Sequence, residues 1–117
     1  MNKLALTISI VLISSPANAG ALSEMLQFKQ RPNKIIVNDV MWNAQDHKKG
    51  KNLVLVQPNI FNIKNSKLVK SRGGWDKILV KKNYVNVATF YLSNKNCIVS
   101  SEGKLIGDKS YIFAFTC

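Results

Sequence analysis

The residues with the clearest potential for chemistry form a basic stretch from Lys64 to Tyr84. This stretch contains Trp75 and one acidic residue, Asp76. Its cationic residues are Lys64, Lys67, Lys70, Arg72, Lys77, Lys81 and Lys82. Cationic side chains hold phosphates or carboxylates electrostatically, and a nearby aromatic ring can stack on a base or sugar. We therefore predict that these cations and Trp75 bind an anionic partner. The competing interpretation is a solvated edge hairpin with Trp75 in the core.

A second candidate is the only histidine, His47, in the run Asp46-His47-Lys48-Lys49. Histidine can serve as a general base or a metal ligand. A zinc site would need further ligands, but there is no second histidine and the acidic residues are scattered. No phosphate-binding loop, dinucleotide fingerprint or nucleophile elbow is present. We therefore expect a protein that is not an enzyme and holds no metal or cofactor.

Cys97 and Cys117 are the only cysteines, so one intrachain disulfide is possible. An intermolecular bridge and a free thiol are the alternatives. If Cys97–Ser100 and Tyr111–Cys117 pair as antiparallel strands about Gly107, Cys97 lies opposite Cys117 and the bridge can form. A reversal at Ser101–Lys104 would instead make Leu105-Ile106 a separate short strand. In either arrangement the disulfide pins the C-terminal strand.

The N-terminal residues have the order of a secretory signal peptide. Lys3 precedes the mostly apolar run Leu4–Ile13, and Ala17-Asn18-Ala19 matches a processing site. We expect residues 1–19 to be the signal peptide and residues 20–117 to form a single domain. The apolar run is too short to span a bilayer, which takes about 20 residues. This interpretation places the protein in the periplasm or outside the cell, where disulfides form.

The net charge also points to anionic partners. The chain has 17 Lys plus Arg against 6 Asp plus Glu, a formal net charge of +11. Such a field favours nucleic acid, cell-envelope polymers, anionic lipid or an acidic protein, and it carries no information about the fold. Only Arg31 and Arg72 are arginines. Recognition by lysine is weakly specific, because an ammonium group binds as a mobile point charge.

The sequence predicts that the elements that position these residues are mainly β-strands. A short amphipathic helix is predicted within Gly20–Arg31, with Pro32 as its stop. We predict a small antiparallel sheet, sandwich or partly open barrel, with an α+β fold as the alternative. The predicted strands are Lys34–Asn38 (with an extension to Trp42 left open), Asn52–Gln57, Lys67–Ser71, Trp75–Lys81, Val85–Leu92, Cys97–Ser100 and Tyr111–Cys117.

Two of these strands, Val85–Leu92 and Tyr111–Cys117, are apolar on both faces, so both should be central and covered on each side. Lys67–Ser71 is short and charged, as edge strands often are. Gly73 and Gly74 would form a reversal that joins it to Trp75–Lys81. The basic stretch would then be a two-stranded ribbon.

These features predict an exported binding module, such as an accessory of an envelope or secretion assembly, that presents lysines and Trp75 to an anionic partner. One alternative is an inhibitor or immunity-type protein that blocks an enzyme with a loop, Asn43–Lys51 or Ser101–Ser110. Another is a small secreted hydrolase or toxin that uses His47 with Asp46.

Overall fold

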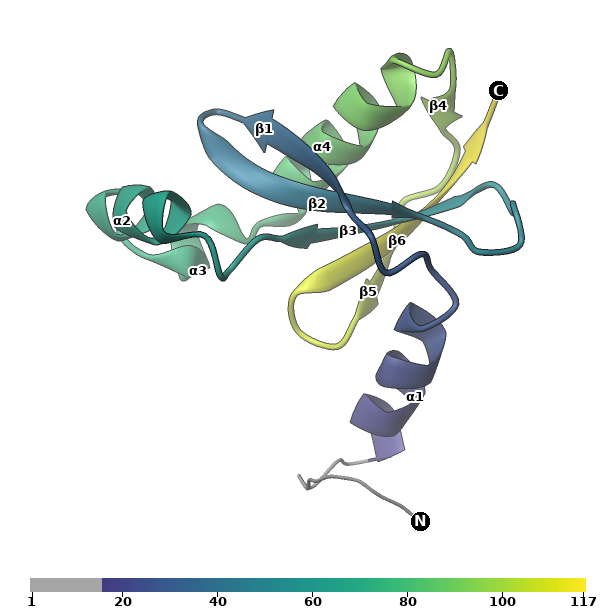
Figure 1. Cartoon of the computed structure of the whole chain (residues 1–117), viewed down its shortest axis with the longest axis horizontal. Coiled ribbons are helices and arrows are strands. Elements are labelled where there is room, and N and C mark those ends of the chain that lie inside the picture. The colour runs from purple at the N-terminus through teal and green to yellow at the C-terminus, as the bar shows by residue number, and fades with distance from the viewer. Residues whose placement is uncertain (1–15) are drawn as a thin grey trace.

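An antiparallel sheet with helices on both faces forms the protein (Figure 1). The computed structural model describes residues 16–117, and residues 1–15 of the predicted signal peptide lie outside the described residues. The strands are β1 (Asn33–Val37), β2 (Val40–Asp46), β3 (Leu53–Pro58), β4 (Ile98–Val99), β5 (Lys104–Ile106) and β6 (Ser110–Thr116). The helices are α1 (Pro16–Met25), α2 (Ile63–Ser71), α3 (Trp75–Ile78) and α4 (Lys81–Ser93). Every helix within residues 16–117 is too short or too polar to span a bilayer.

The strand order is β1-β2-β3-β6-β4, with β5 also paired to β6. Asn38 and Asp39 connect β1 to β2 with φ values of 53° and 68°. A two-residue hairpin loop with positive φ at both positions matches the right-handed twist of its strands, and Asn and Asp tolerate that conformation. The predicted extension of the first strand to Trp42 is therefore a separate strand, β2. This strand runs through Asp46, so Asn43–Lys51 is a loop only in its second half.

Helix α4 covers one face of the sheet. Its buried residues are Tyr84, Val87, Ala88, Tyr91 and Leu92. Their spacing follows the helical period, so they form one apolar stripe. The stripe shares a core with Val40, Trp42 and Ala44, which alternate along β2. The prediction of a strand over Val85–Leu92 was wrong, because the burial of this stripe outweighs the strand preference of Val and Tyr.

The basic stretch is also helical, so the predicted strands Lys67–Ser71 and Trp75–Lys81 and the two-stranded ribbon were wrong. The Asn62 side chain caps α2 by accepting a hydrogen bond of 2.9 Å from the Asn65 backbone N–H. Gly73 and Gly74 have φ values of 100° and 98°. They make the predicted reversal, but it joins α2 to α3 and not one strand to the next.

The other face of the sheet is covered over only part of its area. Phe28, Leu55, Ile106 and Ile112 form a second buried cluster, against which Ala21 and Met25 of α1 pack. A helix is present here, but it spans Pro16–Met25 instead of lying within Gly20–Arg31, so it crosses the predicted processing site after Ala19. After it, Phe28 makes an isolated β-bridge to His47.

The predicted C-terminal strand and disulfide are confirmed. Cys97 and Cys117 are bonded, and no cysteine is free. Strand β4 pairs with β6 as Ile98↔Thr116 and Val99↔Phe115, which is the predicted register. Strand β5 pairs with β6 as Ile106↔Ser110, so Leu105 and Ile106 lie in a separate strand as the second reversal required. The register of the first predicted arrangement and the separate strand of the second are therefore both present. The bend at residues 100–103 separates β4 from β5, and both strands pair with the same edge of β6.

We expect Gly103→Ala to destabilise this bend. Gly103 has a φ of 90°, and an added Cβ would lie 2.5 Å from Cε1 of the buried Phe113 ring. The positive φ and the displaced ring together should lower the free energy of unfolding by about 2 kcal/mol in urea denaturation. Gly107→Ala is the control, because Gly107 also has a positive φ, 64°, but nothing lies within 4 Å of an added Cβ. Equal losses in the two variants would contradict the steric argument.

Candidate functional site

The predicted cationic residues are all exposed in the structure. They extend along α2, around the α2–α3 reversal and into the first turn of α4. Two of them are held by acidic residues. Arg72 lies 3.6 Å from Asp39 and donates a 2.6 Å hydrogen bond to the Asn38 carbonyl, and Lys81 lies 3.7 Å from Glu102. In the described chain, Lys64, Lys67, Lys70, Lys77 and Lys82 have no carboxylate within 4.0 Å.

Trp75 is half-buried and lies beside two of these lysines. It packs against the main core. It also lines an open hollow of about 410 Å³ together with Lys70, Ser66 and the two glycines of the reversal. A Cβ at Gly73 would lie 3.1 Å from Cγ of Lys77, so the Lys77 stem runs over the same reversal. The structure thus brings Trp75, Lys70 and Lys77 together at one reversal.

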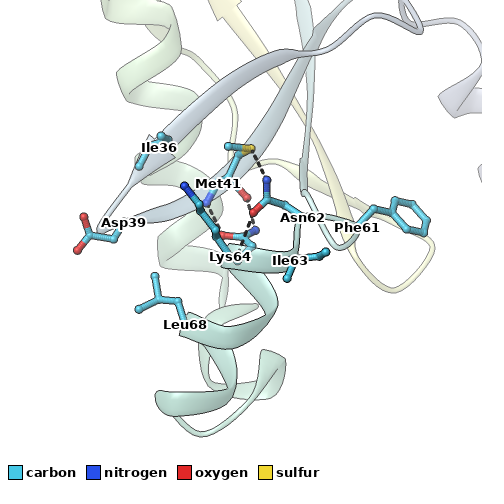
Figure 2. A pocket seen from close by; sticks show the side chains of 9 residues that line it. Ile36, Asp39, Met41, Phe61, Asn62, Ile63, Lys64 and Leu68 are labelled. Carbon is cyan, nitrogen blue, oxygen red and sulfur yellow. Dashed lines mark hydrogen bonds between the residues drawn. The ribbon is translucent and has the colours of Figure 1, made fainter.

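A second hollow, which we call the β1–α2 groove, lies between the β1–β2 hairpin and α2 (Figure 2). Its volume is about 610 Å³. Its apolar lining comes from Ile36, Met41, Phe61, Ile63 and Leu68. Its polar lining comes from Asp39, Asn62, Lys64 and Asn65. The side chains of Phe61 and Ile63 are 89% and 73% exposed, which is unusual for groups of this size.

Asn65 builds the floor of this groove from within α2. Its side chain is 2% exposed and makes three hydrogen bonds to backbone groups. Its Oδ1 accepts a bond of 2.7 Å from the Met41 N–H. Its Nδ2 donates to the Met41 carbonyl at 2.9 Å and to the Asn59 carbonyl at 2.8 Å. The Asn65 amide therefore hydrogen-bonds the backbone N–H and carbonyl of Met41 in β2, at a position beyond the end of β3. These bonds also fix α2 against the sheet.

The Met41 thioether lies between two more asparagines at the same place. Asn59 Nδ2 lies 3.4 Å from the Met41 sulfur, and Asn62 Nδ2 lies 3.8 Å from it. Sulfur is a weak acceptor, so these contacts orient the side chain more than they stabilise it. The groove is thus held in shape by the protein's own polar side chains.

Asp46 and His47 make separate sets of contacts. They are consecutive in an extended segment and point in opposite directions. Asp46 Oδ1 accepts 2.8 Å from the Tyr91 hydroxyl, and Lys95 Nζ lies 3.2 Å from Asp46 Oδ2. His47 is 4% exposed, packs edge-on against Phe28, and accepts a 3.1 Å bond from the Lys49 N–H through Nδ1. Within residues 16–117, no three or more His, Cys, Asp or Glu side chains are grouped as a metal site of such ligands would require.

The Asp46 contacts tie α4 to the sheet. Asn33 Nδ2 donates 2.9 Å to the Tyr91 hydroxyl, and the Lys95 ammonium lies 4.5 Å from the centre of the Tyr91 ring. Burial is the largest influence on Tyr91 and raises the pKa of its phenol. The hydroxyl therefore stays protonated at neutral pH and keeps its donor role.

The β1–α2 groove was missed by the sequence reading. The local signal was Ile60-Phe61 within the polar run Pro58–Asn62, where two large apolar residues have no place in a strand or helix. The exposure of Ile36 could not be predicted, because Ile35, Ile36 and Val37 are all apolar and the sequence does not show which of them faces solvent. Comparison of the chain with protein-family models, curated proteins and solved structures finds no match.

Proposed function

We propose that this protein is a non-enzymatic binding module that is exported to the periplasm or the cell exterior. The part that binds is the α2–α3 basic surface, defined here as Lys67, Lys70, Trp75 and Lys77. Its partner is anionic. The disulfide supports export, because such bonds persist in oxidising compartments. The net charge of +11 supports an anionic partner.

The observation that carries the proposal is the position of Trp75 beside unpaired lysines. A tryptophan serving only the core would have its second side covered, whereas Trp75 lines a hollow with Lys70. Trp75 also packs against the core, and that contact restricts the motion of its ring. A fixed aromatic group between mobile ammonium groups suits a ligand with negative charge and a flat or apolar part.

We expect a triple reversal, Lys67→Glu, Lys70→Glu and Lys77→Glu, to weaken binding to anionic polymers. The probes are labelled polyglutamate and a labelled single-stranded oligonucleotide, measured by fluorescence anisotropy. The wild-type affinity should fall steeply as salt rises, because binding releases counterions. At low salt the variant should lose at least about tenfold in affinity, since each lysine near an anionic surface contributes about 1 kcal/mol.

The matched control is Lys48→Glu, Lys49→Glu and Lys51→Glu, which makes the same charge change at the exposed β2–β3 loop. The control should lose less affinity than the α2–α3 variant. If the two variants lose the same amount, binding depends on net charge alone and the proposed surface is wrong. Trp75→Leu then tests the aromatic contribution, with thermal denaturation as the check on folding.

A further inference from the structure

The open part of the sheet's second face is a further surface without a role in the proposed function. Phe28 and α1 cover one half of this face. The other half carries Ile36, which is 59% exposed, and continues into Phe61 and Ile63. Single exposed apolar residues are common, whereas a group of them around one hollow marks an interaction site. The β1–α2 groove is such a group.

The groove is formed before any partner arrives. Asn65 fixes α2 to Met41 of β2 through two hydrogen bonds and to the Asn59 carbonyl through a third. Asn59 and Asn62 orient the Met41 side chain at the floor. Figure 2 shows Ile36 and Leu68 on opposite sides of the hollow, with Lys64 between them and Phe61 at the outer margin. A site that needs no reorganisation loses little affinity to ordering. The groove can therefore receive an apolar side chain from outside.

The charges around the groove select an acidic occupant. Lys64 lies in its lining, and Lys34 is next but one to Ile36 in β1. Neither has a carboxylate within 4.0 Å in the described part of the chain. The one acidic residue of the lining, Asp39, is already paired with Arg72. A second copy of this chain would bring its own net charge of +11, which opposes self-association.

A neighbouring hollow adds a hydrogen-bonding feature. It is about 170 Å³ in volume and shares Phe61 with the groove, and Asn43, Gln57 and Lys109 also line it. The Asn43 Oδ1 atom is buried and has no hydrogen-bond partner within the described residues. Buried acceptors are nearly always paired. This atom is not accessible from the surface, so it does not discriminate between classes of partner.

We propose that the β1–α2 groove docks a segment of an acidic protein, with an apolar side chain between Ile36 and Leu68 and carboxylates near Lys64 and Lys34. This inference rests on the proposed function and specifies its anionic partner as a protein. The α2–α3 basic surface begins on the same helix, so one acidic partner reaches both. A bilayer surface fits the groove less well, because a flat surface does not fill a hollow.

We test this with two short synthetic peptides of equal negative charge, one of Glu and Leu and one of Glu and Ser. The full protein should bind the leucine peptide about tenfold more tightly, since one buried leucine contributes that much. In a methionine-methyl NMR spectrum the Met41 signal should shift on binding. The Met25 signal should not, because Met25 ends α1 and packs against the second cluster.

The variant is Ile36→Ser with Phe61→Ser, and both side chains are exposed enough for the fold to tolerate the change. It should lose the preference for leucine and keep its polyglutamate binding. The control is Ile98→Ser with Phe90→Ser, the same residue types at 69% and 51% exposure on β4 and α4, which should keep the preference.

Three outcomes would overturn the inference. Equal affinity for the two peptides, with polyglutamate binding intact, contradicts docking in the groove and does not affect the proposed function. If sedimentation equilibrium shows that the wild type is a dimer and the groove variant is a monomer, the face binds a second copy of the chain. Binding to phosphatidylglycerol vesicles that the groove variant loses, without any peptide preference, assigns it to a membrane. Failure of the proposed function itself is distinct, because polyglutamate binding would then not depend on Lys67, Lys70 and Lys77.

Discussion

Replacing Asn65 with Ala is expected to lower the free energy of unfolding by about 3–4 kcal/mol, because it leaves two buried backbone groups without their partner. The Asn65 side chain is 2% exposed, so water does not take its place easily. The change removes three hydrogen bonds and leaves the Met41 N–H and the Asn59 carbonyl without that partner. A buried group left unpaired costs about 1–3 kcal/mol. Urea denaturation measures the loss directly.

Asn86→Ala is the matched control, because Asn86 lies exposed in α4 and has no comparable contacts. That change should be neutral or slightly stabilising, since alanine is the better helix former. Asn65→Asp separates geometry from hydrogen bonding. It keeps the acceptor for the Met41 N–H but sets a carboxylate against two carbonyl oxygens, so it should be as damaging as alanine at neutral pH. A loss below about 1 kcal/mol for Asn65→Ala would contradict the role of this amide.

Removing the disulfide is the second large effect. The bonded cysteines are 20 residues apart. In the chain-entropy model, a closed loop of this length stabilises the fold by about 3 kcal/mol, mainly by restricting the unfolded chain. The variant with Cys97→Ser and Cys117→Ser should therefore lose that much free energy of unfolding and unfold at a lower urea concentration. Both cysteines are changed together so that no single thiol is left to form a bridge between molecules.

The control for the disulfide is the wild-type protein unfolded in the presence of a reductant. Reduced wild type and the double variant should have the same stability, apart from the small cost of a hydroxyl at the buried position 97. If the variant is as stable as the oxidised wild type, the bond does not support the fold. Peptide and polyglutamate binding should survive in the variant where it remains folded, because both proposed surfaces lie on other elements.

The C-terminal half of the sheet could be predicted from sequence because its signals agree. Tyr111–Cys117 alternates between two apolar faces, and a disulfide between Cys97 and Cys117 allows few registers. The structure places Phe113 in the main core and Ile112 in the second cluster, as a central strand requires. Strand pairing, burial and covalent chemistry all constrain the same residues here.

The helix α4 could not be predicted from the sequence in the same way. Residues 84–92 are apolar at nearly every position, so both a strand and a helix can bury most of them. The helical spacing of Tyr84, Val87, Ala88 and Tyr91 was present, but the β-branched residues between them favoured a strand locally. Packing against Trp42 and its neighbours decides in favour of the helix, and that contact is long-range.

The candidate site was predictable only in its charge. The exposed lysines follow from composition, because seven cations with one acidic neighbour cannot all be buried. The approach of Trp75 to Lys70 depends on a reversal between helices, where the sequence indicated one between strands. The β1–α2 groove depends on Asn65 bonding to Met41, a contact between residues 24 apart in the chain. No local sequence pattern indicates that an asparagine side chain will form the hydrogen bonds that a neighbouring strand would otherwise make.

The position of β6 within the sheet bears on how the molecule is made. Strand β6 is the last strand in sequence, yet β3, β4 and β5 all pair with it. A nascent chain that still lacks residues 110–116 can form the β1–β2–β3 meander but has no inner strand to close the sheet. Closure of the sheet must therefore wait until residues 110–116 have been synthesised, and the edge of β3 stays unpaired until then.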